Sequence, residues 1–161
     1  MQSNWFSYNK QKAIQALRYH FISRREIKIL MILVNVFAVI TAAAFFFKKI
    51  SPLAFLLSSA MWFILMLMFW FILPTVIYKK ARTFRDTFRV RLTDSNFTLE
   101  NRAGDRGWGW NEFSGWMESP HFYHLYFSKR AFFIIPKEAF EGDDVHEARK
   151  MFREKIRTTS P

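Results

Sequence analysis

Two apolar stretches decide the architecture of this chain: Ile29–Phe47, ILMILVNVFAVITAAAFFF, and Leu53–Tyr78, LAFLLSSAMWFILMLMFWFILPTVIY. They are 19 and 26 residues long, and neither contains a charged residue. An α-helix needs about 20 mainly apolar residues to cross the hydrocarbon core of a bilayer. Only the five residues KKISP separate the stretches, so the two helices are expected to be antiparallel neighbours. The sequence therefore predicts a transmembrane hairpin with spans 29–47 and 53–78.

The distribution of charge supports a membrane location over nucleic-acid binding. The 161-residue chain carries a net charge of +11, but residues 1–85 hold 12 basic residues and one acidic residue, whereas residues 86–161 hold 12 of each. Basic residues that flank membrane spans mark the cytoplasmic side, which predicts that both termini are cytoplasmic and that nucleic acid is not a partner. Besides the bilayer itself, anionic lipid headgroups are expected to contact the four basic residues that follow the second span, Lys79, Lys80, Arg82 and Arg85.

The segment before the first span reads as a short amphipathic helix over residues 10–22. Its apolar residues recur on one face: Ala13, Ile14, Leu17 and Phe21. Periodicity leaves open whether this face lies on the bilayer surface or packs on the C-terminal domain. Ser23 and Glu26 have the spacing of a capping box, which predicts a bend at Ser23 and the start of a new helix.

The spans contain an amide, Asn35, in the first and two adjacent serines, Ser58 and Ser59, in the second. An amide in hydrocarbon requires a hydrogen-bonding partner, so Asn35 is expected to face the second helix or another copy of the chain, with the two serines as candidate partners. Neither span contains an ionisable residue, so nothing marks a path for protons or ions.

The C-terminal part alternates apolar and polar residues with the period of β-strands and then changes to a helical period. Strands are expected at residues 88–93, 97–100, 107–110, 121–127 and 131–135, and the apolar stripe of the final helix runs from Val145 to Ile156. The last hairpin is apolar on both faces, so its second face requires a cover. Residues 10–22 are the favoured cover, and a second copy of the chain is the alternative.

No arrangement typical of a catalytic or cofactor site is present. The chain has no cysteine, four scattered histidines and five glycines, which excludes disulfides, zinc-type ligand spacing and a glycine-rich phosphate loop. His121 and His124 are three residues apart on a predicted strand and therefore point to opposite faces. We expect neither a metal, a cofactor nor an enzymatic activity.

The C-terminal residues carry a recognisable pattern. Trp110-x-x-Phe113, Glu118, FYHLY at 122–126, FIIPK at 133–137 and Ala139-Phe140 together resemble the YcxB-like family. The resemblance implies a bacterial inner-membrane protein with a short N-terminal helical segment (1–28), two membrane helices (29–78) and a cytoplasmic pleckstrin-homology-like domain (79–161). That domain would be a strongly bent antiparallel sheet closed by one helix, which gives an α+β membrane protein. The motif residues are expected to have packing roles: Trp110, Phe113, Glu118, Tyr126, Pro136, Lys137 and Phe140.

Two hypotheses for function follow. The first is a membrane-anchored interaction or sensing module whose cytoplasmic domain binds a protein or a lipid headgroup. The second is a small transport, channel or holin-like protein that oligomerises through its spans.

Overall fold

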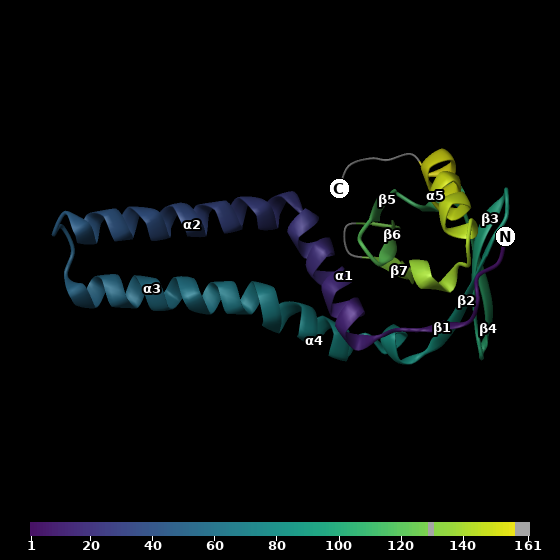
Figure 1. Ribbon diagram of the computed structural model, residues 1–161, viewed down its shortest axis with the longest axis horizontal. Coiled ribbons are helices and arrows are strands. Elements are labelled where there is room, and N and C mark those ends of the chain that lie inside the picture. The colour runs from purple at the N-terminus through teal and green to yellow at the C-terminus, as the bar shows by residue number, and fades with distance from the viewer. Residues whose placement is uncertain (129–130, 157–161) are drawn as a thin grey trace. The chain divides into compact units, whose positions relative to one another are not determined.

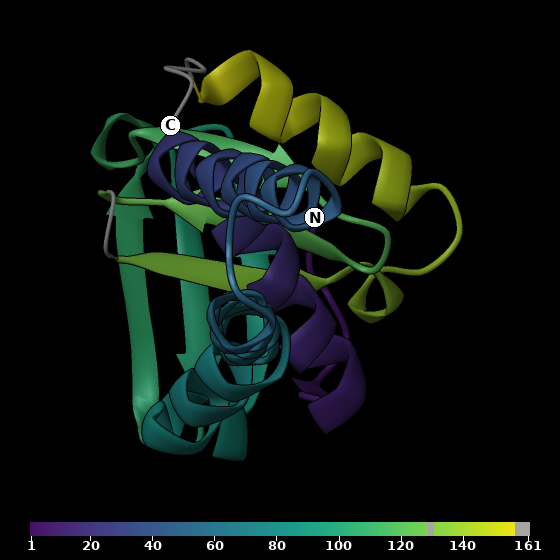
Figure 2. The same ribbon diagram turned by 90° about the vertical axis from the view of Figure 1, so that its left-hand side faces the viewer.

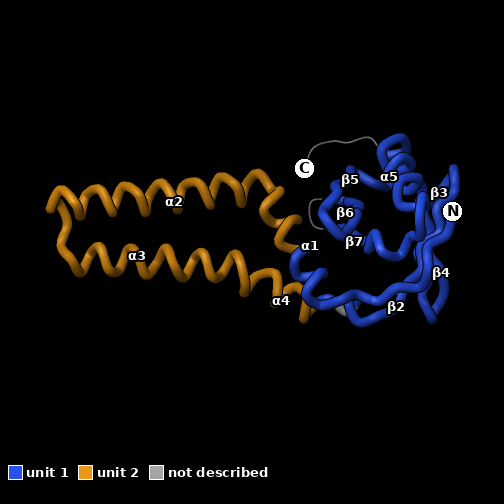
Figure 3. The backbone as a smooth tube through the Cα atoms, viewed as in Figure 1, with its two compact units in different colours: residues 1–16, 81–161 blue, residues 17–80 orange. Residues whose placement is uncertain are grey.

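The computed structural model describes residues 1–128 and 131–156, except for the side chain of Arg82, and divides the chain into two compact units. One unit combines Met1–Ala16 with Ala81–Pro161, and the other is Leu17–Lys80 (Figure 3). This division differs from the one based on sequence, in which residues 1–28 form a separate segment. The first residues instead fold with the C-terminal domain, so the helical hairpin is an insertion into that domain's chain.

The hairpin unit consists of helices joined by short breaks. Its elements in chain order are the end of α1 (Lys10–Ser23), α2 (Arg25–Phe46), α3 (Pro52–Leu67), the π-helical η1 (Met68–Ile72) and α4 (Leu73–Lys80). Figure 1 shows α2 and α3 running antiparallel along their lengths. At the connecting loop, the rings of Phe45 and Phe55 stack with centroids 4.5 Å apart. Ser51 caps α3 by accepting a hydrogen bond from Ala54 N, with Pro52 in the first helical turn.

The bend between α1 and α2 lies where the sequence predicts it, but the predicted capping box is wrong. Ser23 Oγ donates to His20 O at 2.7 Å, within the last turn of α1. Arg24 is the N-cap of α2, in an extended conformation and with no side-chain cap. A hydroxyl in the last turn of a helix reaches its own helix's carbonyls first, so Ser23 ends α1 instead of starting α2.

The surface of the hairpin is apolar. Apart from Trp5 and Tyr19, every large hydrophobic side chain that is exposed in the described residues lies between Ile29 and Val76. Soluble proteins do not leave an apolar surface of this extent in water. The helical stretches Arg25–Phe46 and Pro52–Lys80, of 22 and 29 residues, are long and apolar enough to cross a membrane.

Pro74 shapes the end of the second stretch. A proline in a helix has no N–H for the carbonyl four residues earlier, which here is Trp70 O. The π-helical turn η1 ends at Ile72, two residues before this proline. Arg18 Nε from α1 donates to Trp70 O at 2.8 Å, and its guanidinium lies 5.2 Å from the centroid of the Phe71 ring. Arg18 thus supplies the donor that Pro74 lacks and ties the end of α1 to the hairpin.

The other unit contains two antiparallel sheets. The first has the order β1-β2-β3-β4 and the second the order β5-β6-β7. The strands are β1 (Phe6–Ser7), β2 (Thr87–Leu92), β3 (Asn96–Asn101), β4 (Gly104–Gly109), β5 (Gly115–Glu118), β6 (Phe122–Tyr126) and β7 (Phe132–Pro136). Short 3-10 turns η2 (Arg82–Arg85), η3 (Trp110–Glu112) and η4 (Lys137–Ala139) and the helix α5 (Asp144–Lys155) complete the unit. The strands of the two sheets cross at a steep angle (Figure 2).

The core of this unit is aromatic and is closed by α5. Phe152 of α5 is fully buried, and its ring lies 5.2 Å from that of Tyr123 and 6.2 Å from that of Trp110. Tyr123 also donates its hydroxyl to Val145 O at 2.8 Å, which fixes the start of α5 on the sheet. Aromatic side chains bury large areas, so a few of them stabilise a small domain.

The second face of the last hairpin is also buried, and the N-terminal segment lies on it. Tyr8 Oη donates to Ile134 O at 2.8 Å, and Lys12 forms an ion pair with Glu138. Ala13 and Ala16 in the first half of α1 are fully buried. For this half of α1, packing on the C-terminal domain is therefore observed.

The packing of α5 predicts a large effect of one truncation. Phe152→Ala is expected to lower the free energy of unfolding of the globular unit by about 3–5 kcal/mol, because it leaves a cavity among the rings of Trp110, Trp116 and Tyr123. The measurement is chemical denaturation of the full chain in detergent, followed by tryptophan fluorescence. Arg153→Ala, a truncation at the neighbouring exposed position, is the control and should change stability by less than about 0.5 kcal/mol.

The bond from Arg18 to Trp70 predicts a coupling between two residues far apart in the sequence. Arg18→Ala is expected to destabilise the helical unit by about 1–3 kcal/mol, because it removes a charged donor from a carbonyl that lacks its helical partner. In a Pro74→Ala background, residue 74 supplies its own N–H, so the same change should cost clearly less. Thermal unfolding of the four proteins in one detergent measures the coupling, and equal costs in both backgrounds would contradict this account.

Candidate functional site

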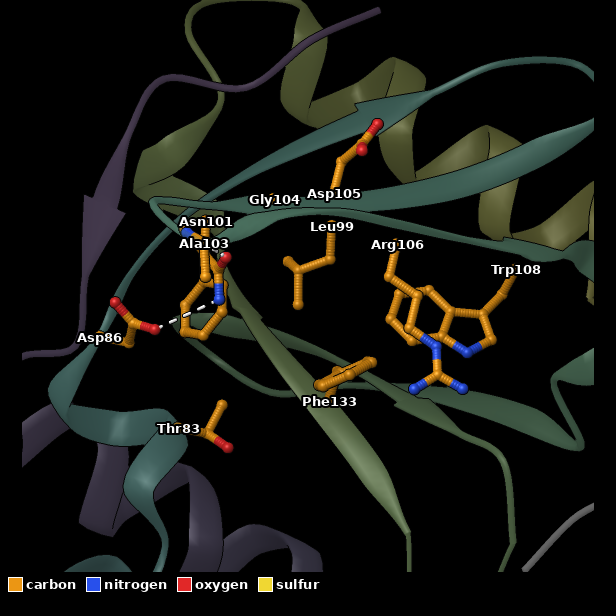
Figure 4. A pocket seen from close by; sticks show the side chains of 11 residues that line it. Thr83, Asp86, Leu99, Asn101, Ala103, Gly104, Asp105, Arg106, Trp108 and Phe133 are labelled. Carbon is orange, nitrogen blue, oxygen red and sulfur yellow. Dashed lines mark hydrogen bonds between the residues drawn. The ribbon is translucent and has the colours of Figure 1, made fainter.

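The described part of the globular unit contains an open pocket of about 520 Å³ (Figure 4). Its apolar wall comes from four different strands, β2, β3, β4 and β7: Phe88, Leu99, Trp108 and Phe133. Polar residues line the remainder: Thr83, Asp86, Asn101, Asp105 and Arg106. An apolar wall with a few polar groups around it is the usual composition of a ligand-binding pocket.

The register of the strands places these side chains. Leu99 pairs with Arg106 and Phe97 with Trp108 across β3 and β4, so Arg106 and Trp108 point to the same face as the core residues. The ring of Trp108 lies 5.3 Å from that of Phe133 on the other sheet. The pocket therefore lies where the two sheets approach each other, against the hairpin formed by β3 and β4.

The two ends of the pocket have opposite charge. Asp86 is held by neighbours, because Asn101 Nδ2 donates to its Oδ2 at 3.3 Å and Thr87 N donates to its Oδ1 at 2.9 Å. The guanidinium of Arg106 lies 5.2 Å from the Trp108 ring centroid and forms no ion pair with any described residue. Asp105 leaves β4 on the opposite side from Arg106 (Figure 4). The charge available to an incoming group next to the Trp108 ring is therefore positive.

Most residues of the sequence motif lie in the core, at a different place from the pocket. Trp110, Phe113, Tyr126 and Phe140 are 4–7% exposed. Pro136 is the last residue of β7 and pairs with Phe122. These positions do not line the pocket.

Glu118 and Lys137 form a charged cluster with a residue that the motif did not include. Arg149 of α5 donates two hydrogen bonds to the Glu118 carboxylate, at 2.6 and 2.9 Å, and Lys137 Nζ lies 2.5 Å from Glu118 Oε1. The cluster ties the end of β5, the end of β7 and helix α5 together. Lys137 also lies 5.5 Å from the Tyr123 ring centroid, on the outside of the core.

The environment of Glu118 favours its ionised form. Partial burial acts to raise the pKa of this carboxyl, but the hydrogen bonds and positive charges of Arg149 and Lys137 outweigh burial, so the pKa lies below its usual value. A carboxylate held by two cations across three elements has the geometry of a structural tie.

The polar residues of the hairpin are arranged differently from the sequence-based expectation. Asn35 Oδ1 accepts a hydrogen bond from Trp62 Nε1 at 3.3 Å, and Asn35 Nδ2 donates to Met31 O at 2.7 Å in its own helix. Ser58 Oγ instead donates to Phe55 O, within α3. The partner of Asn35 on the second helix is thus Trp62, with Ser59 a half-buried neighbour on the same helix.

The basic residues after the second apolar stretch lie on the surface. Lys79 and Lys80 end α4, Arg85 ends η2, and all three are exposed. The side chain of Arg82 lies outside the described part of the structure. No group of three potential metal ligands is present among the described residues.

Residues 92–152 match the family model described as YcxB-like protein. The chain carries a YcxB-like domain. The match runs from the end of β2 to Phe152 of α5, so it includes Arg106, Trp108 and the Glu118 cluster and leaves out the hairpin. The searches of curated proteins and of solved structures gave no match.

The lowered pKa of Glu118 predicts how acid affects the YcxB-like domain. A carboxyl whose pKa is lower in the folded state stabilises the fold above its unfolded pKa, and this contribution is lost as the pH falls through the folded pKa. The free energy of unfolding should therefore fall as the pH decreases below about 4.3, the usual pKa of a glutamate carboxyl, and Glu118→Gln should remove part of this fall. Glu154→Gln, which alters an exposed carboxyl on α5, is the matched control and should leave the pH dependence unchanged.

Proposed function

We propose that the protein is a membrane-anchored binding module of the bacterial inner membrane, acting in interaction or sensing without catalysis. In this proposal the α2–α3 hairpin is the anchor, both termini are cytoplasmic, and the basic residues after the second span contact anionic lipid headgroups. The apolar surface of the hairpin supports insertion, since water would not tolerate it. The excess of basic residues at the outer ends of the two spans supports the orientation.

The globular unit is proposed to be a pleckstrin-homology-like domain. Its support is the arrangement of four strands and three strands in two antiparallel sheets, followed by a C-terminal helix that packs on the core. In this arrangement α5 covers part of the core, while the pocket against the β3–β4 hairpin stays open. In this proposal the binding surface of the domain is the open pocket, which is formed by residues of the two sheets.

The observation that carries the binding function is the pocket with Arg106, a cation that has no ion pair among the described residues. Arg106 and the rings of Trp108 and Phe133 provide one charged and two apolar contacts to an incoming group. A nucleophile with an adjacent base is the usual requirement for covalent catalysis, and the described pocket residues do not supply that pair. Binding without turnover is therefore the function that the geometry supports best.

A transport or channel function receives less support from the hairpin. The sequence suggested this function because the amide of Asn35 in the first span requires a hydrogen-bonding partner. Asn35 has that partner in Trp62 of the same chain. We therefore do not favour this second hypothesis.

A site-specific photocrosslinker in living cells tests the proposal. The benzophenone amino acid placed at Ala103, an exposed residue at the pocket rim, is expected to give a discrete adduct with the membrane-embedded protein. The same amino acid at Lys150, an exposed position on α5, is the control and should give no such adduct. Indistinguishable patterns at the two positions would contradict a binding role for the pocket.

A further inference from the structure

Strand β4 is the last strand of its sheet, and its hydrogen-bonding direction can be worked out from its neighbours. Thr93 N donates to Asn96 O, while Val90 and Leu92 bond to the N-terminal segment on the other side of β2. Because bonding directions alternate along a strand, the residues of β3 that bond to β4 are 97, 99 and 101. Their partners on β4 are 104, 106 and 108. The main-chain groups of the residues between them therefore face away from the sheet.

These outward groups belong to Asp105, Gly107 and Gly109. An independent bond agrees with this assignment, because Gly109 N donates at 2.8 Å to Glu112 Oε1, outside the ladder. No described strand lies beside β4 on this side. Asp105 and Gly107 thus offer two N–H donors and two carbonyl acceptors along an open edge. Such an edge is a template for a further strand unless a protein covers or blocks it.

The side chains at this edge suit a particular kind of strand. Arg106 and Trp108 are two residues apart, so both point to the pocket face of β4. In an antiparallel partner, the residue opposite Trp108 lies two positions before the residue opposite Arg106. The partner residue opposite Trp108 would reach the apolar wall of the pocket. The partner residue opposite Arg106 would face its guanidinium, which has no ion pair among the described residues. The matching sequence is an apolar or aromatic residue, any residue, and then Asp or Glu.

We propose that β4 binds an extended segment of a partner protein by antiparallel strand addition, with an apolar side chain in the pocket and an acidic side chain on Arg106. This proposal rests on the proposed binding function and names the class of partner. Main-chain bonds to Asp105 and Gly107 would supply affinity, and the two side-chain contacts would supply specificity.

A peptide fits these features better than a lipid headgroup does. A headgroup would use the Arg106 cation but leave the donors and acceptors of the edge without partners. A phosphate would also meet the carboxylate of Asp86, which lines the same pocket. An extended backbone uses the edge, the apolar wall and the cation together.

The test uses the full chain in detergent micelles and a fluorescent octapeptide with blocked ends. The peptide alternates threonine and valine, except for phenylalanine at its fourth position and glutamate at its sixth. Fluorescence polarisation is expected to show saturable binding that Arg106→Glu weakens at least tenfold. A peptide with lysine at the sixth position should show the reverse preference and bind the Arg106→Glu protein more tightly than the unaltered protein. Arg91→Glu, the same charge change on β2, is the control and should alter neither affinity more than twofold.

A second arm tests the main-chain bonds. The same peptide with N-methyl groups at its fifth and seventh residues, which would face Gly107 and Asp105, should lose binding. Absence of binding by the first peptide, equal effects of the two charge variants, or binding that survives N-methylation would each overturn strand addition. A pocket-specific photoadduct with lipid from Ala103 would also overturn it, while leaving the membrane-anchored binding function in place. Absence of any pocket-specific adduct would instead remove the binding function itself.

Discussion

The pairing of β1 with β2 is the constraint on which the rest of the structure depends. Phe6 pairs with Phe88 and Ser7 with Thr87, although nearly eighty residues lie between them along the chain. Ser3 strengthens the junction, because its N–H donates to Val90 O and its hydroxyl accepts from Val90 N, both at 2.8 Å. The pairing fixes both ends of the helical insertion to one folded unit. It also brings Tyr8 to β7 and α1 to the second face of the last hairpin.

In the globular unit, the residues that stabilise the fold and the residues that line the open pocket lie in different parts. Its aromatic core, the Glu118 cluster and α5 hold one part of the two sheets together, with Phe152 in contact with rings from three different elements. The β3–β4 hairpin extends beyond this part, and its inner face meets the ring of Phe133 over an open pocket. The strand that lines this pocket, β4, contains three glycines and is the most exposed strand of its sheet. Residues that match the family pattern are concentrated in the stable part, which explains why the motif itself pointed to packing.

Much of the architecture was predictable, because it depends on local periodicity. The two apolar helices, the basic helix at residues 10–22, the later strands and the C-terminal helix all follow from runs that are long enough to show a period. The strands β1 and β5 were missed for a physical reason. β1 has only two residues, and Gly115–Glu118 has no clear alternation, so long-range pairing alone defines both strands.

The functional side chains were less predictable than the fold. Arg149, Trp62 and Arg18 act through partners that are 27 to 52 residues away in the sequence, so spacing gave no signal for them. The sequence does contain a signal for Arg106: it alternates with Trp108 in a glycine-rich segment, which places the cation and the ring on the same face of a strand. For Arg18 the signal was Pro74, since a proline inside a helix always leaves a carbonyl in need of another donor.

The insertion of the hairpin between β1 and β2 has a consequence for biosynthesis. β1 leaves the ribosome first, but its partner follows only after the whole of residues 8–86 has been made. At about 5–20 residues per second, the wait is roughly 4–16 s, far longer than strand pairing itself requires. The apolar helices therefore emerge before the sheet can close. The two apolar helices can therefore pair before the sheet of the domain is complete, so the order of translation sets the order of assembly.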